Sequence, residues 1–571
     1  MTTTMTETGA ELPAGRFSAN ERWLIGPPGT GKTTRIAGMV RGTADRYGAD
    51  SVLVSSFSRA AAAEIASRDL GEVDPQRVGT LHGICYRLRE GVRLAEVGEG
   101  VREWNATSAG MRWPIGVTLT AEQVDDMTSP FADAGATERG AGDELLSKVA
   151  LRRMRMIDRR VWTDDERAFH RAWTDWKIES ERTDFTDLIE WELENGNGAP
   201  FGARFGFFDE AQDFSPLEVA LVRKWASHMD GAMLVGDPLQ TIYTFKGADP
   251  DSVFPRDFPR ERVEVLRQSY RVPRRVHAAA CRWIKSQSRE GFEYDARDAD
   301  GTYRSNGASF TNSEVRQLVS EAEAAAKDGT VMLLASSGYM LMGALSEMRA
   351  RGIPFHNPFR KQRGDWNPTR AFERLVGFLA PRPDLLGRDY EPRLWRASEL
   401  FSMLDLVPVR DGGPLLRGAK AALERRVKDE RRVPNALPLS VTDLRTYLTP
   451  KAIEDARAAM DSDTPWRLAA RWAEGSTKSK LLAFALSVCE RKGPRALVEP
   501  PKVIVGTIHS VKGAEADTVF MSQAMSASAR DSSGSDPAAR DAMQRAFYVG
   551  MTRARHNLIV SSCGWDGAGI N

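Results

Sequence analysis

One short segment, GPPGTGKT at residues 26–33, constrains this chain more than any other feature of its sequence. It follows the apolar run at residues 23–25 and precedes a stretch of helical character. The segment fits the spacing G-x-x-x-x-G-K-[ST], in which glycines let backbone N–H groups converge on phosphates. The N-terminus of the following helix adds partial positive charge. The alternative is a glycine-rich turn without a ligand, but motif and flanking pattern agree, and together they predict a phosphate-binding loop.

The loop predicts a site for ATP and Mg²⁺. Lys32 is expected to reach the β- and γ-phosphates, and Thr33 to bind Mg²⁺ through its hydroxyl. The residues predicted to contact the nucleotide from the loop and the start of its helix are Gly26, Pro27, Pro28, Gly29, Thr30, Gly31, Lys32, Thr33, Thr34 and Arg35.

A pair of carboxylates follows a second apolar run. The segment FGFFDEAQD at residues 205–213 places Asp209 and Glu210 where a strand is expected to end. In a phosphate-loop protein such an aspartate holds the Mg²⁺ shell, and the adjacent glutamate can activate the attacking water as a general base. A strand that ends in Asp-Glu is common in any protein. Its combination with the upstream loop favours the catalytic interpretation.

The composition of the chain restricts the classes of protein to which it can belong. The 571 residues are 42% hydrophobic and 27% charged, which is typical of a globular chain of several domains. The net charge of +1 neither supports nor excludes a nucleic-acid partner, because a basic groove can be hidden in a neutral sum. The four cysteines are scattered without a CxxC pair, so neither a zinc site nor a disulfide framework is predicted. We find no secretory signal and no membrane span, and we expect a cytoplasmic protein.

Alternating strand and helix patterns predict an α/β fold with parallel sheets, interrupted by two mainly helical stretches. We expect a disordered leader at residues 1–20. A first core, with the ATP site, is predicted at residues 21–90 and 201–280, with a helical insertion at 91–200. A second core is predicted at 281–380 and 499–571, with a helical insertion at 381–498.

Further segments resemble the ordered motifs of superfamily 1 DNA helicases of the UvrD/Rep group. Besides the phosphate loop and DEAQD, they are SFSRAAAAEI (56–65), VGTLHGICYRL (78–88), VGDPLQTIYTFKGAD (235–249), LRQSYR (266–271), GTIHSVKGAEADTVF (506–520) and QRAFYVGMTRAR (544–555). The resemblance covers both predicted cores and neither insertion. It implies two RecA-like phosphate-loop NTPase domains that bind Mg·ATP between them and single-stranded DNA across them.

The same resemblance implies roles for single residues at the nucleotide. Gln240 resembles the glutamine that senses the γ-phosphate, and Arg271 and Arg553 resemble the arginines that reach it from the second side of the cleft. An arginine supplied on closure can be worth about 10³–10⁵ in rate. Tyr270 resembles a residue that stacks on the nucleotide base, and Glu515 an acid that meets the ribose. The alternative for each residue is a surface ion pair or a packed aromatic ring.

The resemblance also implies a track for single-stranded DNA. The aromatic candidates could stack on bases of any sequence, and the polar ones could contact the strand's backbone. The predicted contacts are Phe57, Thr80, His82, Tyr243, Phe245, Lys246, Thr507, His509 and Lys512. Core packing and interior histidines are the alternatives. A basic run in the first insertion (residues 152–160), followed by Trp162, Trp173 and Trp176, either contacts duplex DNA or forms a solvated helix face.

The chain departs from the group in one respect that bears on specificity. The group has an adenine-reading glutamine upstream of its phosphate loop, whereas residues 1–25 contain none, and Asn20 is the nearest substitute. A strict preference for ATP is therefore not predicted.

The leading hypothesis is an ATP-dependent DNA helicase that moves on single-stranded DNA and unwinds 3′ to 5′. The alternatives are a DNA-end or gap sensor with an ATPase switch, and a translocase that strips proteins from DNA. We expect a monomer that binds single-stranded and tailed duplex DNA, with repair or replication proteins as potential partners.

Overall fold

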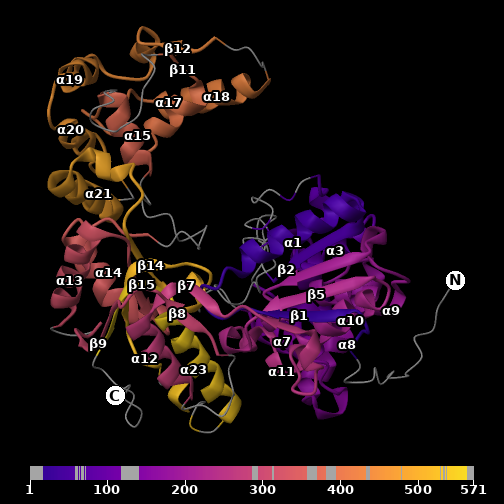
Figure 1. The fold of residues 1–571 in the computed structure, drawn as a ribbon. Helices are drawn as coiled ribbons and strands as arrows, with labels where there is room; N and C mark the ends of the chain where they lie inside the picture. The colour runs from indigo at the N-terminus through magenta and orange to yellow at the C-terminus, as the bar shows by residue number, and fades with distance from the viewer. Residues whose placement is uncertain are drawn as a thin grey trace. The chain divides into compact units, whose positions relative to one another are not determined.

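A computed structural model describes residues 17–57, 72–116, 140–285, 293–310, 314–356, 370–380, 394–432, 437–476, 479–526 and 536–561, together with residues 62, 65, 70, 529–531 and 534. The chain divides into two compact units (Figure 1). Unit 1 comprises residues 1–301 and 527–553, and unit 2 comprises residues 302–526 and 554–571. Residues 281–301 and 527–553 are thus grouped with the first sheet, and the predicted boundaries of the individual domains stay a prediction. Within the described residues, we find no helix of the length and apolarity that crossing a membrane requires.

Unit 1 is built on a parallel sheet of six strands in the order β3-β2-β4-β5-β1-β6. The strands are β1 (Glu21–Ile25), β2 (Val52–Ser56), β3 (Val78–Gly79), β4 (Phe205–Asp209), β5 (Gly231–Gly236) and β6 (Val263–Val265). Ile25 lies opposite Gly236, and Ser56 opposite Asp209. Because parallel strands end at the same edge, this register brings the segments that follow β1, β2, β4 and β5 together. The expected α/β fold with parallel sheets is confirmed.

Helices cover both faces of this sheet, so its central strands are apolar on both sides. Trp23 and Ile25 join a core with α3 (Leu81–Leu88), α9 (Phe185–Asn195) and α10 (Pro216–Ala226). Leu24 points to the other face, where it packs with α1 (Lys32–Tyr47). Further helices and strands described in the unit outside its helical insertion are α11 (Pro250–Val253), β7 (Gln268–Pro273), α12 (Arg274–Lys285), β8 (Asp295–Arg297) and α23 (Pro537–Met551).

The described residues between 98 and 179 of unit 1, 98–116 and 140–179, are mainly helical and have an aromatic core of their own. The helices are α4 (Gly98–Asn105), α5 (Ser108–Arg112), α7 (Ala141–Met154) and α8 (Asp164–Glu179). The three tryptophans that sequence analysis considered for duplex DNA pack in this core, with Trp104 and Phe169; they are Trp162, Trp173 and Trp176. The alternative that these rings contact duplex DNA is therefore wrong, since the faces of the rings meet other side chains of the core.

A buried ion network joins α7 and α8 to α9. The Arg153 guanidinium lies 2.9 Å from Asp184, and the Lys177 ammonium lies 2.5 Å from the same carboxylate. Asp187 and Glu190 complete the network around Arg153. Burial raises the pKa of Asp184, but the two cations outweigh it and hold that pKa well below its usual range. The carboxylate is therefore ionised and depends on both cations.

Unit 2 contains a second parallel sheet, of five strands in the order β13-β10-β14-β15-β9. These are β9 (Thr302–Gly307), β10 (Val331–Ala335), β13 (Val503–Thr507), β14 (Ala516–Met521) and β15 (Ala554–Ser561). The helices α13 (Val315–Asp328) and α14 (Met342–Ala350) pack on its apolar face through Leu318, Val319 and Met348.

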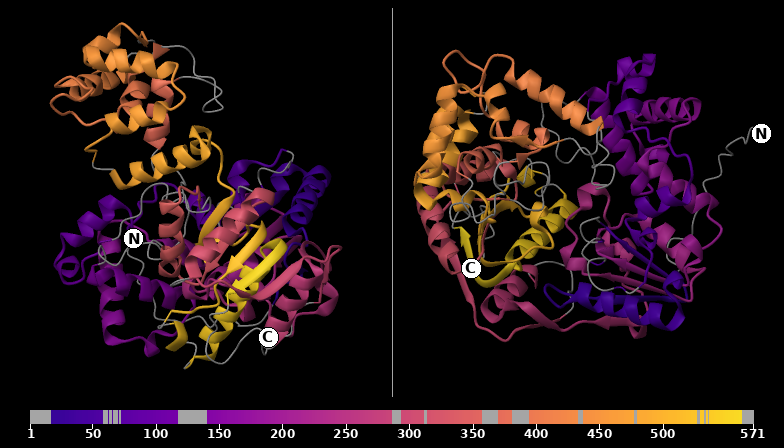
Figure 2. Two further views of the ribbon diagram at one scale, coloured as in Figure 1. Left: turned by 90° about the vertical axis from the view of Figure 1, so that its left-hand side faces the viewer. Right: turned by 90° about the horizontal axis from the view of Figure 1, so that it is seen from above.

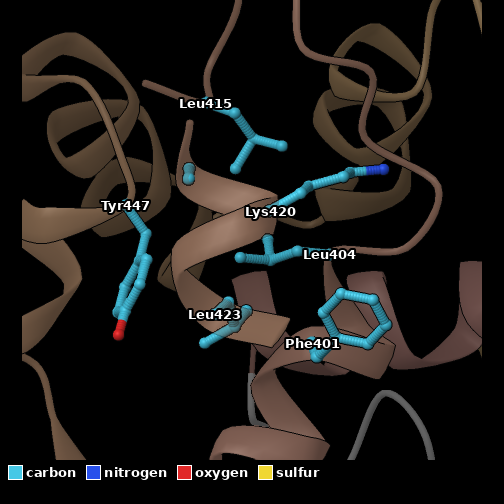
Figure 3. Close-up of a pocket in the computed structure, with 7 residues that line it drawn as sticks. Phe401, Leu404, Leu415, Lys420, Leu423 and Tyr447 are labelled. Atoms are coloured by element: carbon cyan, nitrogen blue, oxygen red, sulfur yellow. The ribbon is translucent and has the colours of Figure 1, made fainter. Parts of the chain in front are cut away.

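Between β10 and β13 the chain forms a helical bundle, drawn in orange in Figures 1 and 2. Its helices are α15 (Arg370–Leu379), α17 (Ala397–Met403), α18 (Ala419–Arg432), α19 (Pro450–Met460), α20 (Pro465–Trp472) and α21 (Ser479–Lys492). A helical insertion was predicted at residues 381–498, yet a short antiparallel pair also forms there from β11 (Leu394–Trp395) and β12 (Leu439–Ser440). Figure 3 shows a small apolar recess in this bundle, where Phe401, Leu404 and Leu423 lie beside Tyr447.

Candidate functional site

The phosphate loop lies between β1 and α1 in unit 1. Gly29 and Gly31 have φ values of 73° and 80°, a backbone region that residues with a Cβ rarely adopt. Gly31 precedes α1 and has no side chain to cap it, so the first N–H groups of the helix face the loop. This arrangement favours an anion at the helix N-terminus.

The Lys32 side chain folds back over the loop. Its Nζ donates to the Gly26 carbonyl at 2.6 Å. A Cβ added at residue 26 would lie 2.0 Å from Lys32 Cγ, so the fold of this side chain requires glycine there. The hydroxyl of Thr30 donates to the Pro27 carbonyl at 2.8 Å and stiffens the turn. The loop thus presents its lysine where phosphates are expected.

The carboxylate pair follows β4 at the same edge of the sheet. Asp209 is the last residue of the strand and is 2% exposed. Glu210 follows with a φ of 52°, a left-handed conformation that is costly for a glutamate. Such strained positions cluster at functional sites. The Glu210 carboxylate accepts a hydrogen bond from Gln212 Nε2 at 2.5 Å.

The end of β5 adds a buried polar chain that runs to the last part of unit 1. Asp237 Oδ2 accepts from Gln240 Nε2 at 2.8 Å, and Gln240 Oε1 accepts from Arg553 Nη2 at 3.0 Å. Arg553 is 1% exposed and also donates to the Val549 carbonyl at 2.9 Å. Burial raises the pKa of Asp237, and the Lys32 charge offsets part of this rise. The structure therefore brings Gln240 and Arg553 into direct contact.

Strand β7 is attached to the phosphate loop. Tyr270 N donates to the Gly29 carbonyl at 2.8 Å, and Ser269 Oγ donates to the Pro28 carbonyl at 2.7 Å. A Cβ at Gly29 would lie 2.4 Å from Arg271 Cβ, so the backbones approach closely. The Tyr270 side chain is 71% exposed, which leaves its ring open to stacking.

Two of the predicted nucleotide contacts have ion-pair partners. The Arg35 guanidinium lies 3.1 Å from Glu264 on β6. Glu515 lies in unit 2, and its carboxylate accepts from Arg555 at 2.8 Å.

Asn20, the substitute for the missing glutamine, uses its side chain elsewhere. Its Nδ2 donates to the Met229 carbonyl at 2.8 Å and so ties the segment before β1 to the one before β5. This contact gives Asn20 a structural role.

Three aromatic rings and a lysine lie together near the edge of the first sheet that carries the phosphate loop. The Phe57 ring stacks on Tyr243, with 5.1 Å between centroids, and Phe245 packs edge-on against Tyr243 at 6.0 Å. Lys246 Nζ lies 5.0 Å from the Tyr243 centroid, within range of a cation–π interaction. Burial raises the pKa of the Tyr243 hydroxyl, whereas Phe245 is 51% exposed. We call Phe57, Tyr243, Phe245 and Lys246 the aromatic cluster.

Thr80 and His82 lie at the start of α3. The Thr80 hydroxyl caps the helix by accepting from Gly83 N at 3.1 Å, and the residue is buried. His82 Nδ1 lies 3.7 Å from Glu218 Oε1. Burial lowers the pKa of His82 to about 4 and raises that of Glu218 to about 7. His82 is therefore neutral at pH 7.

The predicted DNA contacts of unit 2 lie at the end of β13 and on the turn that follows it. Thr507 ends the strand, and its Oγ1 accepts from Ser510 N at 3.3 Å. A short 3₁₀ turn at His509–Val511 follows, and Lys512 N donates to the His509 carbonyl at 3.5 Å. The three side chains thus share one short segment.

Sequence analysis did not single out Gln212 and Asp237, although both belong to this site. Asp237 N donates to Gln212 Oε1 at 3.1 Å, which links the segment after β4 to the one after β5. The sequence contained a signal that could have identified them, since both are polar residues within three positions of the end of an apolar strand.

Comparison with protein families and curated proteins identifies relatives of the chain. Residues 15–246 match the family model described as an AAA domain, and residues 478–564 match the UvrD-like helicase C-terminal domain. A 120-residue segment is 31% identical to ATP-dependent DNA helicase PcrA of Bacillus subtilis and covers 19% of this chain and 16% of PcrA. A 299-residue segment is 25% identical to ATP-dependent DNA helicase UvrD2 of Mycobacterium tuberculosis and covers 46% of this chain and 41% of UvrD2. Each match therefore spans less than half of the relative's length.

Proposed function

Since the chain belongs to the UvrD-like superfamily 1 helicases, we propose that it is an ATP-dependent DNA helicase that moves along single-stranded DNA and unwinds duplexes 3′ to 5′. The observation that carries the proposal is the convergence of the phosphate loop, the carboxylate pair and the Gln240–Arg553 contact at one edge of the first sheet. The 3′-to-5′ direction rests on the resemblance of residues 512–515 to the group's fifth motif.

ATP hydrolysis is assigned to this edge. Lys32 binds the phosphates, and Thr33 with the buried Asp209 supplies the hydroxyl and carboxylate oxygens that suit Mg²⁺. When bound, Mg²⁺ neutralises charge on the phosphate oxygens. Glu210 takes the proton of the attacking water. Arg271 and Arg553 stabilise the charge that develops on the transferred phosphoryl group, and Tyr270 stacks on the base.

Single-stranded DNA binding is assigned to the aromatic cluster and to residues 507–512. Exposed Phe245 and its neighbouring rings offer stacking surface, worth about 1–3 kcal/mol per base, and Lys246 adds positive charge for the backbone. Stacking does not distinguish sequence, as a translocating protein requires.

Two assays on the purified chain test the proposal. ATP turnover is measured with and without single-stranded DNA, and strand displacement is measured on duplexes with a 3′ or a 5′ tail. We expect DNA-stimulated turnover and displacement of the 3′-tailed substrate only. Lys32→Ala serves as the control and should lose turnover while it retains DNA binding. Turnover without displacement of either substrate would favour a DNA-end sensor or a protein-stripping translocase instead.

A further inference from the structure

The Gln212 side chain bridges two strand ends at the proposed catalytic edge. Its Nε2 donates to Glu210 Oε2 at 2.5 Å, and its Oε1 accepts from Asp237 N at 3.1 Å. The residue is completely buried, so no solvent competes for either bond. A Cβ at Gly236 would lie 2.2 Å from Gln212 Oε1, which shows how closely the amide fits against β5.

A side-chain amide suits both of these bonds, because it carries a donor and an acceptor at any ordinary pH. The Glu210 carboxylate needs a donor, and the Asp237 N–H needs an acceptor, so the orientation of the amide is fixed by its two partners. A carboxylate at residue 212 would lose the donor, and an aliphatic side chain would lose both groups. The hydrogen bond from Thr241 Oγ1 goes to the backbone carbonyl of Gln212 and would survive either change.

We propose that Gln212 is a positioning residue that fixes the carboxylate of Glu210 for proton abstraction. The inference rests on the proposed ATPase function and deepens it. Glu210 lies in a left-handed conformation between β4 and the turn at Ala211–Asp213, and the hydrogen bond from Gln212 Nε2 holds its carboxylate against this turn. Asp237, which accepts the Gln240 amide, anchors the other side of Gln212, so the general base is tied to the segment that contacts Arg553.

A double-mutant cycle tests the inference. Gln212→Met, Glu210→Gln and the double variant are compared for turnover at saturating single-stranded DNA, nucleotide affinity and melting temperature. Gln212→Met should lower kcat by about tenfold or more, since a general base contributes about 10²–10⁴. Nucleotide affinity should change by no more than about threefold, because the phosphate-binding residues are untouched. In the Glu210→Gln background, Gln212→Met should lower kcat by less than about twofold. The exposed Gln76 provides a matched control, and Gln76→Met should behave as wild type.

Gln212→Glu provides a second variant that keeps the shape and the acceptor for Asp237 N. It should lose at least as much kcat as Gln212→Met, because it places a second carboxylate beside Glu210. Wild-type turnover in Gln212→Glu would overturn the inference, as would multiplicative losses in the cycle or a parallel loss of nucleotide affinity. A wild-type chain without ATP turnover would overturn the proposed function itself and this inference with it.

Discussion

Arg553 is buried, and its proposed role is to stabilise charge on the transferred phosphoryl group. Its guanidinium contacts Gln240 and Val549 inside unit 1. The alternative of a surface ion pair for this residue is wrong, because it is 1% exposed. Gln240 is the proposed γ-phosphate sensor. Its contact with Arg553 would therefore carry a change at the nucleotide to α23, the helix that precedes Arg553.

Replacement of Arg553 should affect rate far more than binding. Arg553→Ala is expected to lower ATP turnover by about 10³ or more, because the transition state gains more from this charge than the ground state does. Arg553→Lys should restore little, since a point charge does not reproduce the planar guanidinium. Steady-state kinetics with saturating single-stranded DNA provide the measurement. A loss below tenfold at unchanged melting temperature would remove Arg553 from the proposed active site.

His82 should make the stability of the chain depend on pH. Its pKa of about 4 in the folded state lies below the ordinary value of 6.5, so protonation favours the unfolded state. The stability from neutral His82 is fully present above about pH 6.5 and is lost as pH falls toward 4. Between pH 7 and 5 the loss is on the order of 2 kcal/mol.

Comparison with His82→Asn isolates this contribution, because Glu218, whose raised pKa acts in the opposite direction, titrates in both proteins. Denaturant unfolding at each pH is the measurement. The variant should lose about 2 kcal/mol less than wild type on acidification from pH 7 to 5. Parallel pH profiles would show that His82 is not buried as described.

At the scale of elements, the ion network of Arg153, Lys177 and Asp184 fastens α7 and α8 to α9. Local sequence presented Arg153 as one member of a basic run, whereas its carboxylate partners lie some thirty residues further on. The network thus joins α7 and α8, which pack mainly in the aromatic core of the insertion, to α9, which packs in the core of the first sheet.

Removal of one cation should destabilise unit 1 strongly. Lys177→Met is expected to cost about 3–5 kcal/mol, because it leaves carboxylate charge buried with fewer partners. Arg160→Met is the control, since Arg160 is exposed and pairs with exposed Asp158, and ion pairs in such positions contribute little to stability. Urea unfolding of the two variants gives the comparison. Similar small losses for both would mean that the network adds no more than surface pairs do.

Sequence patterns predicted contiguous features well and long-range ones poorly. The phosphate loop lies within eight residues, and strands such as β4, β5 and β13 are apolar runs, so all were visible locally. The pairing of Gln212 with Asp237 depends on strand order, which no local pattern contains. The tryptophans of α8 gave an ambiguous signal, because a helical stripe of aromatics looks the same whether it meets DNA or a core.

At the scale of the whole molecule, the proposed DNA contacts come from both units, while Lys32, Glu210, Gln240 and Arg553 all come from unit 1. The proposed DNA residues of unit 2 are Thr507, His509 and Lys512. Substitutions at these three positions therefore test whether DNA that contacts unit 2 stimulates ATP turnover.

Lys512→Ala should weaken DNA binding and leave the basal ATPase intact. Loss of one phosphate contact should lower the slope of log affinity against log salt by about 0.7 for single-stranded DNA. Fluorescence anisotropy at several salt concentrations measures the slope, and turnover without DNA gives the basal rate. Lys428→Ala, in an exposed pair with Glu424 on α18, is the control and should leave both unchanged. An unaltered slope for Lys512→Ala would exclude the residue from the DNA track.

The division of the chain into two units also determines the order in which parts of each unit are synthesised. Unit 1 begins before the phosphate loop but ends at Arg553, after nearly all of unit 2 has been translated. At roughly 5–20 residues per second, about half a minute to two minutes separate the emergence of Lys32 from that of Arg553 on a ribosome. During this interval Gln240 lacks its guanidinium partner, and α12 and the turn at Pro238–Gln240 lack the helix α23 that packs against them. The proposed ATP site is therefore completed only after the whole stretch between Lys32 and Arg553 has been synthesised, although its phosphate loop emerges long before.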